Sequence, residues 1–395
     1  MIVPLGAVAT TAPPTGTSAS LTIAVAEPAP PPDVPVPVPA PVDELLAEVV
    51  DVVPAESLDP QAASVPAPAS VTTPARTTVR RSGLASGCMG GTIASGAERF
   101  LGKEIRMPVR EHVAEQVTDV CTEHGEGVVW DASTGLVRFV DLEAGALMTY
   151  DPGSGEVSRR QIGKVAACIR PRRGGGLVVA AERTFVLLGP EGTVDGELGP
   201  VFEDENIRFN DGGCDPAGRF WMGTTAYDET PGAGSLYRLD GEGNVGLVLT
   251  DVTISNGLSF APDGRSAWYV DTPTGRVDRL EVDPSTGTVT RRTPLVDHVE
   301  PGNPDGIAVD AEGGVWVALW DGSGVNRYDA QGQLTDRVPL PCSQVTCPAF
   351  AGPDLTDLYV TTSRRGLEEG AEPAAGALFR VRPGVAGLPV LPYAG

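Results

Sequence analysis

Short apolar runs recur along the chain, and each follows a polar residue that is often followed by glycine. The pattern is clearest in residues 303–310 (NPDGIAVD), and it returns in residues 126–131 (EGVVWD), 210–215 (NDGGCD) and 256–261 (NGLSFA). From Glu126 to Asn210 is 84 residues, from Asn210 to Asn256 is 46, and from Asn256 to Asp305 is 49. The first interval is therefore about two copies long. Periods in this range indicate repeated supersecondary units, and four short strands per unit is the propeller case.

Each copy contains further strand-like runs, which are separated by turns rich in Asp, Asn, Gly and Pro. These residues are favoured in hairpin turns. Six copies can be read along the chain, and the runs expected to form strands are 136–142 and 146–151, 177–181 and 184–189, 219–224 and 235–240, 266–271 and 277–283, 315–319 and 324–329, and 358–362 and 377–381. The pattern predicts an all-β fold, a six-bladed β-propeller.

Closure of such a ring commonly takes a strand from each end of the chain in one blade, because this leaves no exposed strand edge there. We expect residues 109–120 to provide the N-terminal closing strand. Its expected partners are the strands around Tyr359 and Phe379.

Residues 1–106 differ in composition from the repeats. Residues 1–75 contain no Lys or Arg and 16 of the 37 Pro, which predicts a disordered Pro/Ala-rich extension ahead of a propeller domain at 107–395. Met107 stands 19 residues before Glu126, so translation starting at Met107 is a hypothesis that the intact mass of native protein would test. The start lacks the basic and uninterrupted apolar parts of a secretory signal. We therefore expect a cytoplasmic protein.

The charge balance limits the partners. With 52 acidic and 29 basic residues the net charge is −23, which disfavours nucleic acid and anionic membranes and leaves a cation or a small metabolite. No run of 18 apolar residues is present to cross a membrane. We expect a monomer or a weak homo-oligomer.

The cysteines and histidines exclude further chemistry. The six Cys include no Cys-x-x-Cys pair, so we expect reduced thiols and no thiolate zinc site. The three His make most His-based metal sites and a Ser-His-Asp triad improbable.

Four oxygen-bearing side chains stand at one phase of the repeat: Glu126, Asn210, Asn256 and Asp305. In a propeller the start of each innermost strand lies at the central channel, so these side chains are expected to converge. Two carboxylates and two amide oxygens suit Ca²⁺, Mg²⁺ or Mn²⁺, and Zn²⁺ when waters complete its shell. Polar residues followed by glycine are also common in hairpin turns without any further function. Their recurrence at the same position of four repeats is, however, better explained by a shared site than by coincidence.

Three segments carry a family resemblance. Residues 208–224 (RFNDGGCDPAGRFWMGT), 256–264 (NGLSFAPDG) and 304–318 (PDGIAVDAEGGVWVA) resemble signatures of the regucalcin (senescence marker protein), gluconolactonase and luciferin-regenerating family. Residues 347–352, 358–362 and 376–381 are similar to its closing blade, and the likeness covers about 108–388.

The resemblance implies a six-bladed propeller and one divalent metal ion held by the positions of Glu126, Asn256 and Asp305. It also implies that Asn210 lies beside the metal as ligand or substrate contact, and that Arg208 contacts substrate. Asp228 stands where relatives often carry a substrate-contacting Glu, which is a departure. Further departures are Gly213 and Cys214 within the first signature, and His124 before the first ligand.

The family's chemistry implies a gluconolactonase-like enzyme that opens sugar-type lactones. A divalent ion polarises the carbonyl and lowers the pKa of a bound water, and Asp305 could accept the proton of that water as general base. Arg208 would hold ring hydroxyls or the carbonyl oxygen. The alternative role of Arg208 is a surface ion pair with Glu203 or Glu205.

Two other functions remain open from the sequence. One is hydrolysis of phosphotriester-like esters on the same metal centre. The other is a calcium-binding propeller without turnover.

Overall fold

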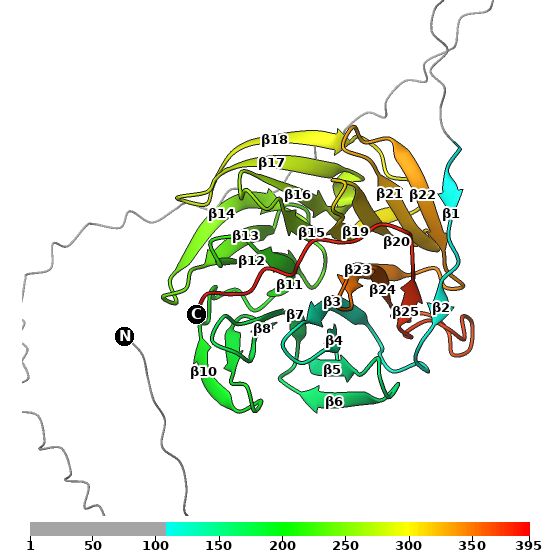
Figure 1. Cartoon of the computed structure of the whole chain (residues 1–395). Coiled ribbons are helices and arrows are strands. Elements are labelled where there is room, and N and C mark those ends of the chain that lie inside the picture. The colour runs from blue at the N-terminus through cyan, green and yellow to red at the C-terminus, as the bar shows by residue number, and fades with distance from the viewer. Residues whose placement is uncertain (1–107) are drawn as a thin grey trace, which may run out of the picture. The chain divides into compact units, whose positions relative to one another are not determined.

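Six antiparallel sheets surround a central axis in the computed structural model, which describes residues 108–395 (Figure 1). The expectations for the extension lie outside the described residues. The first three sheets are blade 1 with β3 (Gly125–Asp131), β4 (Leu136–Asp141), β5 (Ala146–Tyr150) and β6 (Val157–Gln161), blade 2 with β7 (Ala166–Pro171), β8 (Leu177–Ala181), β9 (Phe185–Leu188) and β10 (Val194–Leu198), and blade 3 with β11 (Ile207–Cys214), β12 (Phe220–Ala226), β13 (Gly234–Leu239) and β14 (Val245–Val252).

The other three sheets complete the predicted six-bladed propeller. They are blade 4 with β15 (Ser255–Phe260), β16 (Ser266–Asp271), β17 (Val277–Asp283) and β18 (Thr288–Val296), blade 5 with β19 (Asn303–Val309), β20 (Val315–Trp320), β21 (Gly324–Tyr328) and β22 (Leu334–Pro339), and blade 6 with β23 (Val345–Ala351), β24 (Asp357–Thr362) and β25 (Phe379–Val381). One short 3-10 turn, η1 (Thr272–Thr274), follows β16. The described residues include no helix long and apolar enough to cross a membrane.

The ring closes through β2 (Glu115–Gln116), which pairs antiparallel with β25 as the outer strand of blade 6. Gln116 lies opposite Phe379, so the expected closing strand and one of its two partners are confirmed. The expected pairing near Tyr359 is wrong, because Tyr359 lies in β24, which pairs with β23 and β25 instead.

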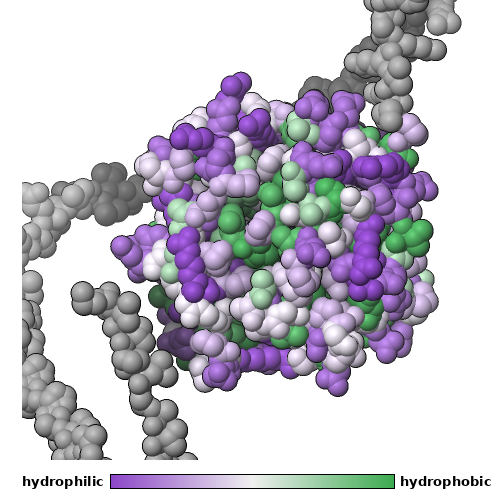
Figure 2. All heavy atoms as spheres, in the orientation of Figure 1, coloured by the Kyte–Doolittle hydropathy of each residue, from purple (hydrophilic) through white to green (hydrophobic). Residues whose placement is uncertain are grey.

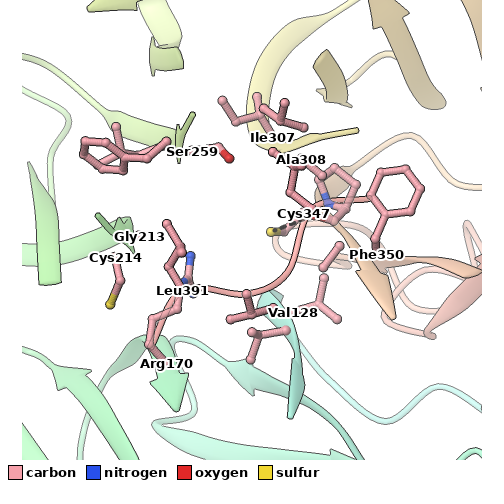
Figure 3. A pocket seen from close by; sticks show the side chains of 18 of the residues that line it. Val128, Arg170, Gly213, Cys214, Ser259, Ile307, Ala308, Cys347, Phe350 and Leu391 are labelled. Atoms are coloured by element: carbon pink, nitrogen blue, oxygen red, sulfur yellow. Dashed lines mark hydrogen bonds between the residues drawn. The ribbon is translucent and has the colours of Figure 1, made fainter. Parts of the chain in front are cut away.

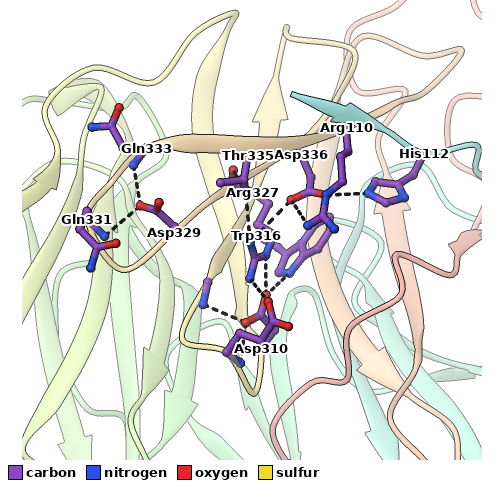
Figure 4. A network of polar contacts seen from close by, with 12 residues as sticks. Arg110, His112, Asp310, Trp316, Arg327, Asp329, Gln331, Gln333, Thr335 and Asp336 are labelled. Atoms are coloured by element: carbon purple, nitrogen blue, oxygen red, sulfur yellow. Dashed lines mark hydrogen bonds and ion pairs between the residues drawn. The ribbon is translucent and has the colours of Figure 1, made fainter. Parts of the chain in front are cut away.

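A second N-terminal strand, β1 (Arg110–Glu111), pairs parallel with β22 and makes blade 5 five-stranded. Arg110 Nε and His112 Nε2 each lie 2.8 Å from the buried carboxylate of Asp336. Arg327 lies between Asp336 and Asp310 and joins the two carboxylates into one network (Figure 4). This network attaches the N-terminal segment to blade 5.

Burial follows the position of a strand within its blade. All residues of β3, β8 and β11 are buried, whereas the outer strand β6 is exposed throughout. Apolar side chains from neighbouring blades pack between the sheets and form the core. Burial is therefore high in the inner strands of a blade and low at its outer edge.

A β-bulge occurs at the same place in all six innermost strands. Their pairing with the next strand shifts by one residue at or next to Glu126, Ala167, Asn210, Asn256, Asp305 and Thr346. A bulge re-aims side chains and commonly lies beside a functional site. The six residues occupy equivalent positions near one end of the channel, which we call the mouth.

The opposite end of the channel is crossed by residues 386–394, which we call the strap (Figure 1). Gly387 N donates to Leu355 O of blade 6, and Leu388 N donates to Val309 O of blade 5. Tyr393 N donates to Pro171 O of blade 2, and the buried Tyr393 hydroxyl donates to Asp240 O of blade 3 at 2.8 Å. The strap thus connects four blades.

Candidate metal centre and substrate site

The four oxygen-bearing residues of the repeat phase lie in innermost strands of different blades. Glu126 is in β3, Asn210 in β11, Asn256 in β15 and Asp305 in β19, and all four side chains are buried. Asn210 Nδ2 donates to Asn256 Oδ1 at 2.8 Å. Glu126 and Asp305 lie close enough for the charge of Glu126 to raise the pKa of Asp305. Blades 1, 3, 4 and 5 therefore contribute to one polar site.

The carboxylates of this site are held without a cationic partner in contact. Burial, and then the charge of Asp211, raise the pKa of Glu126 to about 8. Burial, followed by the charges of Glu126 and Asp211, raises the pKa of Asp305 well above its ordinary value. No ion pair to any of these three carboxylates forms within residues 108–395. Buried like charges of this kind are relieved by a proton or by a metal ion.

The donor chemistry fits a hard divalent cation. Carboxylate and amide oxygens are the ligands that Ca²⁺, Mg²⁺ and Mn²⁺ prefer. Within the described residues no three side chains of the His, Cys, Asp and Glu types are grouped so that they could hold an ion by themselves. A donor set at this site would therefore have to include an amide oxygen, and Asn256 offers one.

Asp211 was missed by reasoning from the sequence. It follows Asn210 in the bulge of β11 and is buried, and Gly212 N donates to its Oδ1 at 2.7 Å. Alignment by polar-glycine pairs would have matched Asp211-Gly212 to Asn256-Gly257. The strand register instead matches Asn210 to Asn256, and places Asp211 one position deeper in the channel.

Arg208 is buried at the mouth, with 6% of its surface exposed. Its Nη1 donates to Asn210 Oδ1 at 2.7 Å and to Phe209 O at 3.0 Å, while its Nε has no partner. The alternative ion pair with Glu203 or Glu205 is wrong. Arg183 makes those contacts, with Nη1 donating to Glu203 O and Nη2 lying 3.4 Å from Glu205 Oε1.

An aromatic ring and an acidic group support Arg208 from blades 2 and 3. The ring of Tyr227 lies 5.8 Å from the Arg208 guanidinium carbon and 4.8 Å from Lys164 Nζ. Its hydroxyl donates to Glu182 Oε1 at 2.5 Å. Cations over an aromatic face are attracted by its quadrupole. Tyr227 therefore forms one wall beside Arg208.

Loops from opposite sides of the ring meet over the mouth. Arg365, in the loop after β24, pairs with Glu143 of blade 1 at 2.9 Å and with Glu229 of blade 3 at 3.7 Å. Blades 3 and 6 lie across the axis from each other (Figure 1). This three-residue bridge narrows the entrance to the buried oxygen donors.

The channel continues beyond these donors to a cavity of about 110 Å³ on the strap side. Arg170, Cys214, Ser259 and Cys347 line it together with apolar residues of the innermost strands and the strap (Figure 3). Apolar residues surround a hollow near the centre of this face (Figure 2). Asp211 also lines this cavity, but Glu126, Asn256 and Asp305 do not, so the mouth is the better candidate site for a polar substrate.

Comparison with known proteins agrees with this geometry. The model of the SMP-30/gluconolactonase/LRE-like region matches residues 124–364, which is more than half of the chain. The chain belongs to this family. It is 38% identical to a pentonolactonase of Haloferax volcanii and 37% identical to a 6-deoxy-6-sulfogluconolactonase of Pseudomonas putida, in each case over 69% of this chain and at least 95% of the relative.

Regucalcin of Sus scrofa is 35% identical over 69% of this chain and 95% of its own. Among solved structures, a luciferin-regenerating enzyme superposes with a TM-score of 0.67 at 31% identity, covering 72% of this chain and all of its own. A calcium-binding regucalcin of Agrobacterium tumefaciens superposes with a TM-score of 0.69 at 29% identity over 73% of this chain. The similarity to SMP-30/gluconolactonase/LRE-like proteins thus spans the whole propeller.

Two departures noted in the sequence lie at the mouth of this SMP-30/gluconolactonase/LRE-like propeller. Asp228 is exposed in the loop after β12, where its Oδ1 accepts hydrogen bonds from Asn206 Nδ2 and Thr230 Oγ1. His124 is buried, with Nδ1 2.8 Å from Ser363 Oγ and its ring 5.8 Å from that of Trp320. Burial, and then the charges of Arg208 and Arg365, lower the pKa of His124 to about 3, so its imidazole is neutral.

The thiols of the channel form no alternative metal site. The five cysteines within the described residues form no disulfide. Burial raises the pKa of Cys168 to about 12 and also raises the pKa of Cys347 and Cys214. Metal ligation by cysteine requires the thiolate. Burial therefore favours the protonated form of these three thiols.

Proposed function

We propose that this protein is a divalent-metal-dependent lactonase that opens sugar-type lactones to aldonic acids. The convergence of Glu126, Asn256 and Asp305 in one buried, carboxylate-rich site supports the metal dependence. The names of two relatives, a pentonolactonase and a sulfogluconolactonase, support the lactone as substrate class.

In this proposal Glu126, Asn256 and Asp305 hold one ion, which is Ca²⁺, Zn²⁺, Mg²⁺ or Mn²⁺. When bound, the ion supplies Lewis acidity toward the lactone carbonyl and lowers the pKa of a water molecule. Asn210 lies beside the ion, where its Oδ1 accepts from Arg208 and its amide group holds Asn256. In this arrangement the two carboxylates balance the charge of the divalent ion, and Asn256 adds a neutral oxygen ligand.

Asp305 is the proposed general base. Its buried position and its two carboxylate neighbours raise its pKa, so its affinity for a proton is greater than that of an exposed aspartate. With a divalent ion bound, the pKa of Asp305 would be lower, so that the carboxylate is ionised and able to accept a proton near neutral pH. Asp305 accepts the proton of the attacking water, and that proton can then pass to the leaving ring oxygen.

Arg208 and Asp228 are the proposed substrate contacts. Arg208 lies at the mouth with a buried Nε that has no partner in the protein, and its guanidinium would donate to a ring hydroxyl or to the carbonyl oxygen of the lactone. Asp228 lies at the exposed rim, where it would accept hydrogen bonds from outer hydroxyls of the sugar. The bridge of Arg365 over the mouth separates bound substrate from bulk water.

Proton release from gluconolactone, corrected for spontaneous hydrolysis, tests the proposal. We expect turnover that is lost with chelator and restored by divalent ions. Asp305→Asn should lose about 10²- to 10⁴-fold in kcat. Asp354→Asn, an exposed carboxylate in a hairpin turn, serves as the control and should act like the wild type. Metal content is measured in both variants, so that loss of the base is distinguished from loss of the ion.

The second candidate is a calcium-binding propeller without turnover. The regucalcin relatives, one of them described as a calcium-binding protein, favour it. Binding of Ca²⁺ at the site, without hydrolysis of any lactone in the presence of any of the four ions, would support this candidate against the lactonase. Hydrolysis of a phosphotriester in place of a lactone would instead indicate an esterase of that class.

A further inference from the structure

Thr272 makes two hydrogen bonds that connect the donors of two blades. It is the first residue of η1, and its backbone N donates to Ile254 O at 3.1 Å. Its Oγ1 lies 2.7 Å from Asn256 Nδ2 and 2.9 Å from Pro304 O. Pro304 directly precedes Asp305. The hydroxyl thus joins the amide of one proposed ligand to the backbone beside another.

The chemistry of these groups fixes the direction of each bond. A threonine hydroxyl has one hydrogen to donate, and a backbone carbonyl can only accept. The hydroxyl of Thr272 must therefore donate to Pro304 O, and its lone pair accepts from Asn256. The group of Asn256 that faces Thr272 is consequently the NH₂, and its Oδ1 faces the other way. The orientation of an amide is often ambiguous, but here the partners decide it.

The hydrogen-bond partners of Asn210 fix the orientation of its amide in the same way. Asn210 Nδ2 donates to Ser255 O at 2.9 Å, which identifies this atom as nitrogen because a carbonyl cannot donate. The same NH₂ donates to Asn256 Oδ1, and Asn210 Oδ1 accepts from Arg208 Nη1. Neither amide can rotate by half a turn without placing like groups against each other.

We propose that Thr272 is a positioning residue for the metal site: its hydroxyl holds the amide of Asn256 with the oxygen directed to the ion. The inference rests on the proposed metal centre. Groups that orient ligands in this way commonly contribute 10- to 100-fold to metal affinity. Because the carboxylates alone do not make a complete donor set, the orientation of Asn256 has a large effect on binding.

Loss of the hydroxyl has a defined consequence. Thr272→Val keeps the shape of the side chain but leaves Asn256 Nδ2 and Pro304 O without this partner. The amide of Asn256 is then oriented only by the hydrogen bond from Asn210 Nδ2, so the direction of its oxygen is less restrained. The backbone bond from Thr272 N to Ile254 O is retained in the variant, so η1 stays in place.

The test measures the affinity of the purified protein for Mn²⁺, Ca²⁺ and Zn²⁺ by competition with a chelator. We expect Thr272→Val to bind about 10- to 100-fold more weakly than the wild type. Thr272→Ser retains the hydroxyl and should restore near wild-type affinity. Thr274→Val is the matched control, because Thr274 lies in the same turn and its hydroxyl donates to Asp271 O at 2.7 Å, away from Asn256. It should bind like the wild type.

Three results would overturn the inference. Wild-type affinity in Thr272→Val, with weak binding in Asn256→Ala, would leave the metal site standing and remove Thr272 from it. A Thr272→Ser variant as weak as Thr272→Val would show that the methyl group matters and the hydroxyl does not. A wild-type protein that binds none of the ions would overturn the proposed metal centre and this inference together. Circular dichroism checks folding, and Thr272→Ala replaces the valine variant should that variant unfold.

Discussion

The charge of Glu126 raises the pKa of Asp305, although the two residues are 179 positions apart in the chain. They lie in β3 and β19, on blades 1 and 5, and blade 6 lies between these blades in the ring. Repulsion between buried carboxylates stabilises their protonated forms. The carboxylates of the metal-free site therefore bind protons at higher pH than exposed carboxylates do.

Stability of the metal-free protein should fall as pH rises from about 4.5 to 8. Glu126 has a pKa of about 8 in the folded chain against an ordinary value of 4.5, so only the folded state holds its proton in this range. This contribution is complete at pH values below 4.5 and is lost as pH rises through 8. Melting temperatures in chelator measure it, and added divalent ion should stabilise most at high pH.

Glu126→Gln is the control for this pH dependence, since an amide does not titrate. Its metal-free melting temperature should depend less on pH over the same range. A wild-type melting temperature that stays constant or rises between about pH 4.5 and 8 would contradict the shared burial of the two carboxylates.

His124 should remain neutral throughout the physiological range. Its folded pKa of about 3 lies below the ordinary 6.5, so its contribution to stability is present above pH 6.5 and is lost as pH falls toward 3. The chain has three His, which makes the imidazole NMR signals few and easy to assign with His124→Asn. Its signal should not shift between pH 5 and 8. Titration near 6.5 would mean that the ring is solvated.

A chain that begins at Met107 should fold as stably as the full chain, because it keeps β1 and β2. We propose that residues 107–395 are the working domain. A chain that begins at Ala114 loses Arg110 and His112, which leaves Asp336 buried with only Arg327 nearby. Removing partners from a buried acceptor costs about 1 to 3 kcal/mol. Equal urea midpoints for the two truncated chains would show that β1 does not contribute to the stability of the propeller.

Tyr393 should be the most sensitive position of the strap. Its ring is buried in the core of blades 2 and 3, and truncation of a large buried aromatic residue to Ala costs about 3 to 5 kcal/mol. Tyr393→Phe loses only the hydrogen bond to Asp240 O, at about 1 kcal/mol. Urea unfolding measures both, with the exposed Val113→Ala as control. Similar midpoints for the Ala variant and the wild type would show that the strap is not packed in solution.

The strands of the blades could be predicted because their signals are local. The runs 266–271 and 315–319 were expected as strands, and β16 and β20 have nearly these bounds. Alternating burial and turn residues at short range specify each hairpin. The parallel strand β1 has no such signal, because it is two residues long and pairs with β22 more than 200 residues away.

The candidate site could be predicted only in part. Repetition identified the phase of Glu126, Asn256 and Asp305, because equivalent positions in a ring converge. Asp211 and Thr272 are not found by spacing, since the first depends on a one-residue bulge and the second lies in a loop of blade 4. The burial of Arg208, which excludes its ion pair with Glu203, follows only from the packing of blade 3.

The bulge shared by the six innermost strands gives the channel a ring of six positions with equivalent backbone placement. In this chain four of the positions are Glu126, Asn210, Asn256 and Asp305, and the remaining two are Ala167 and Thr346. The backbone offset is the same in every blade, but the surroundings differ, because Ala167 is buried in the apolar core. A carboxylate introduced at Ala167 would be buried among apolar side chains, so the packing between blades decides which positions of the ring can accept a charge.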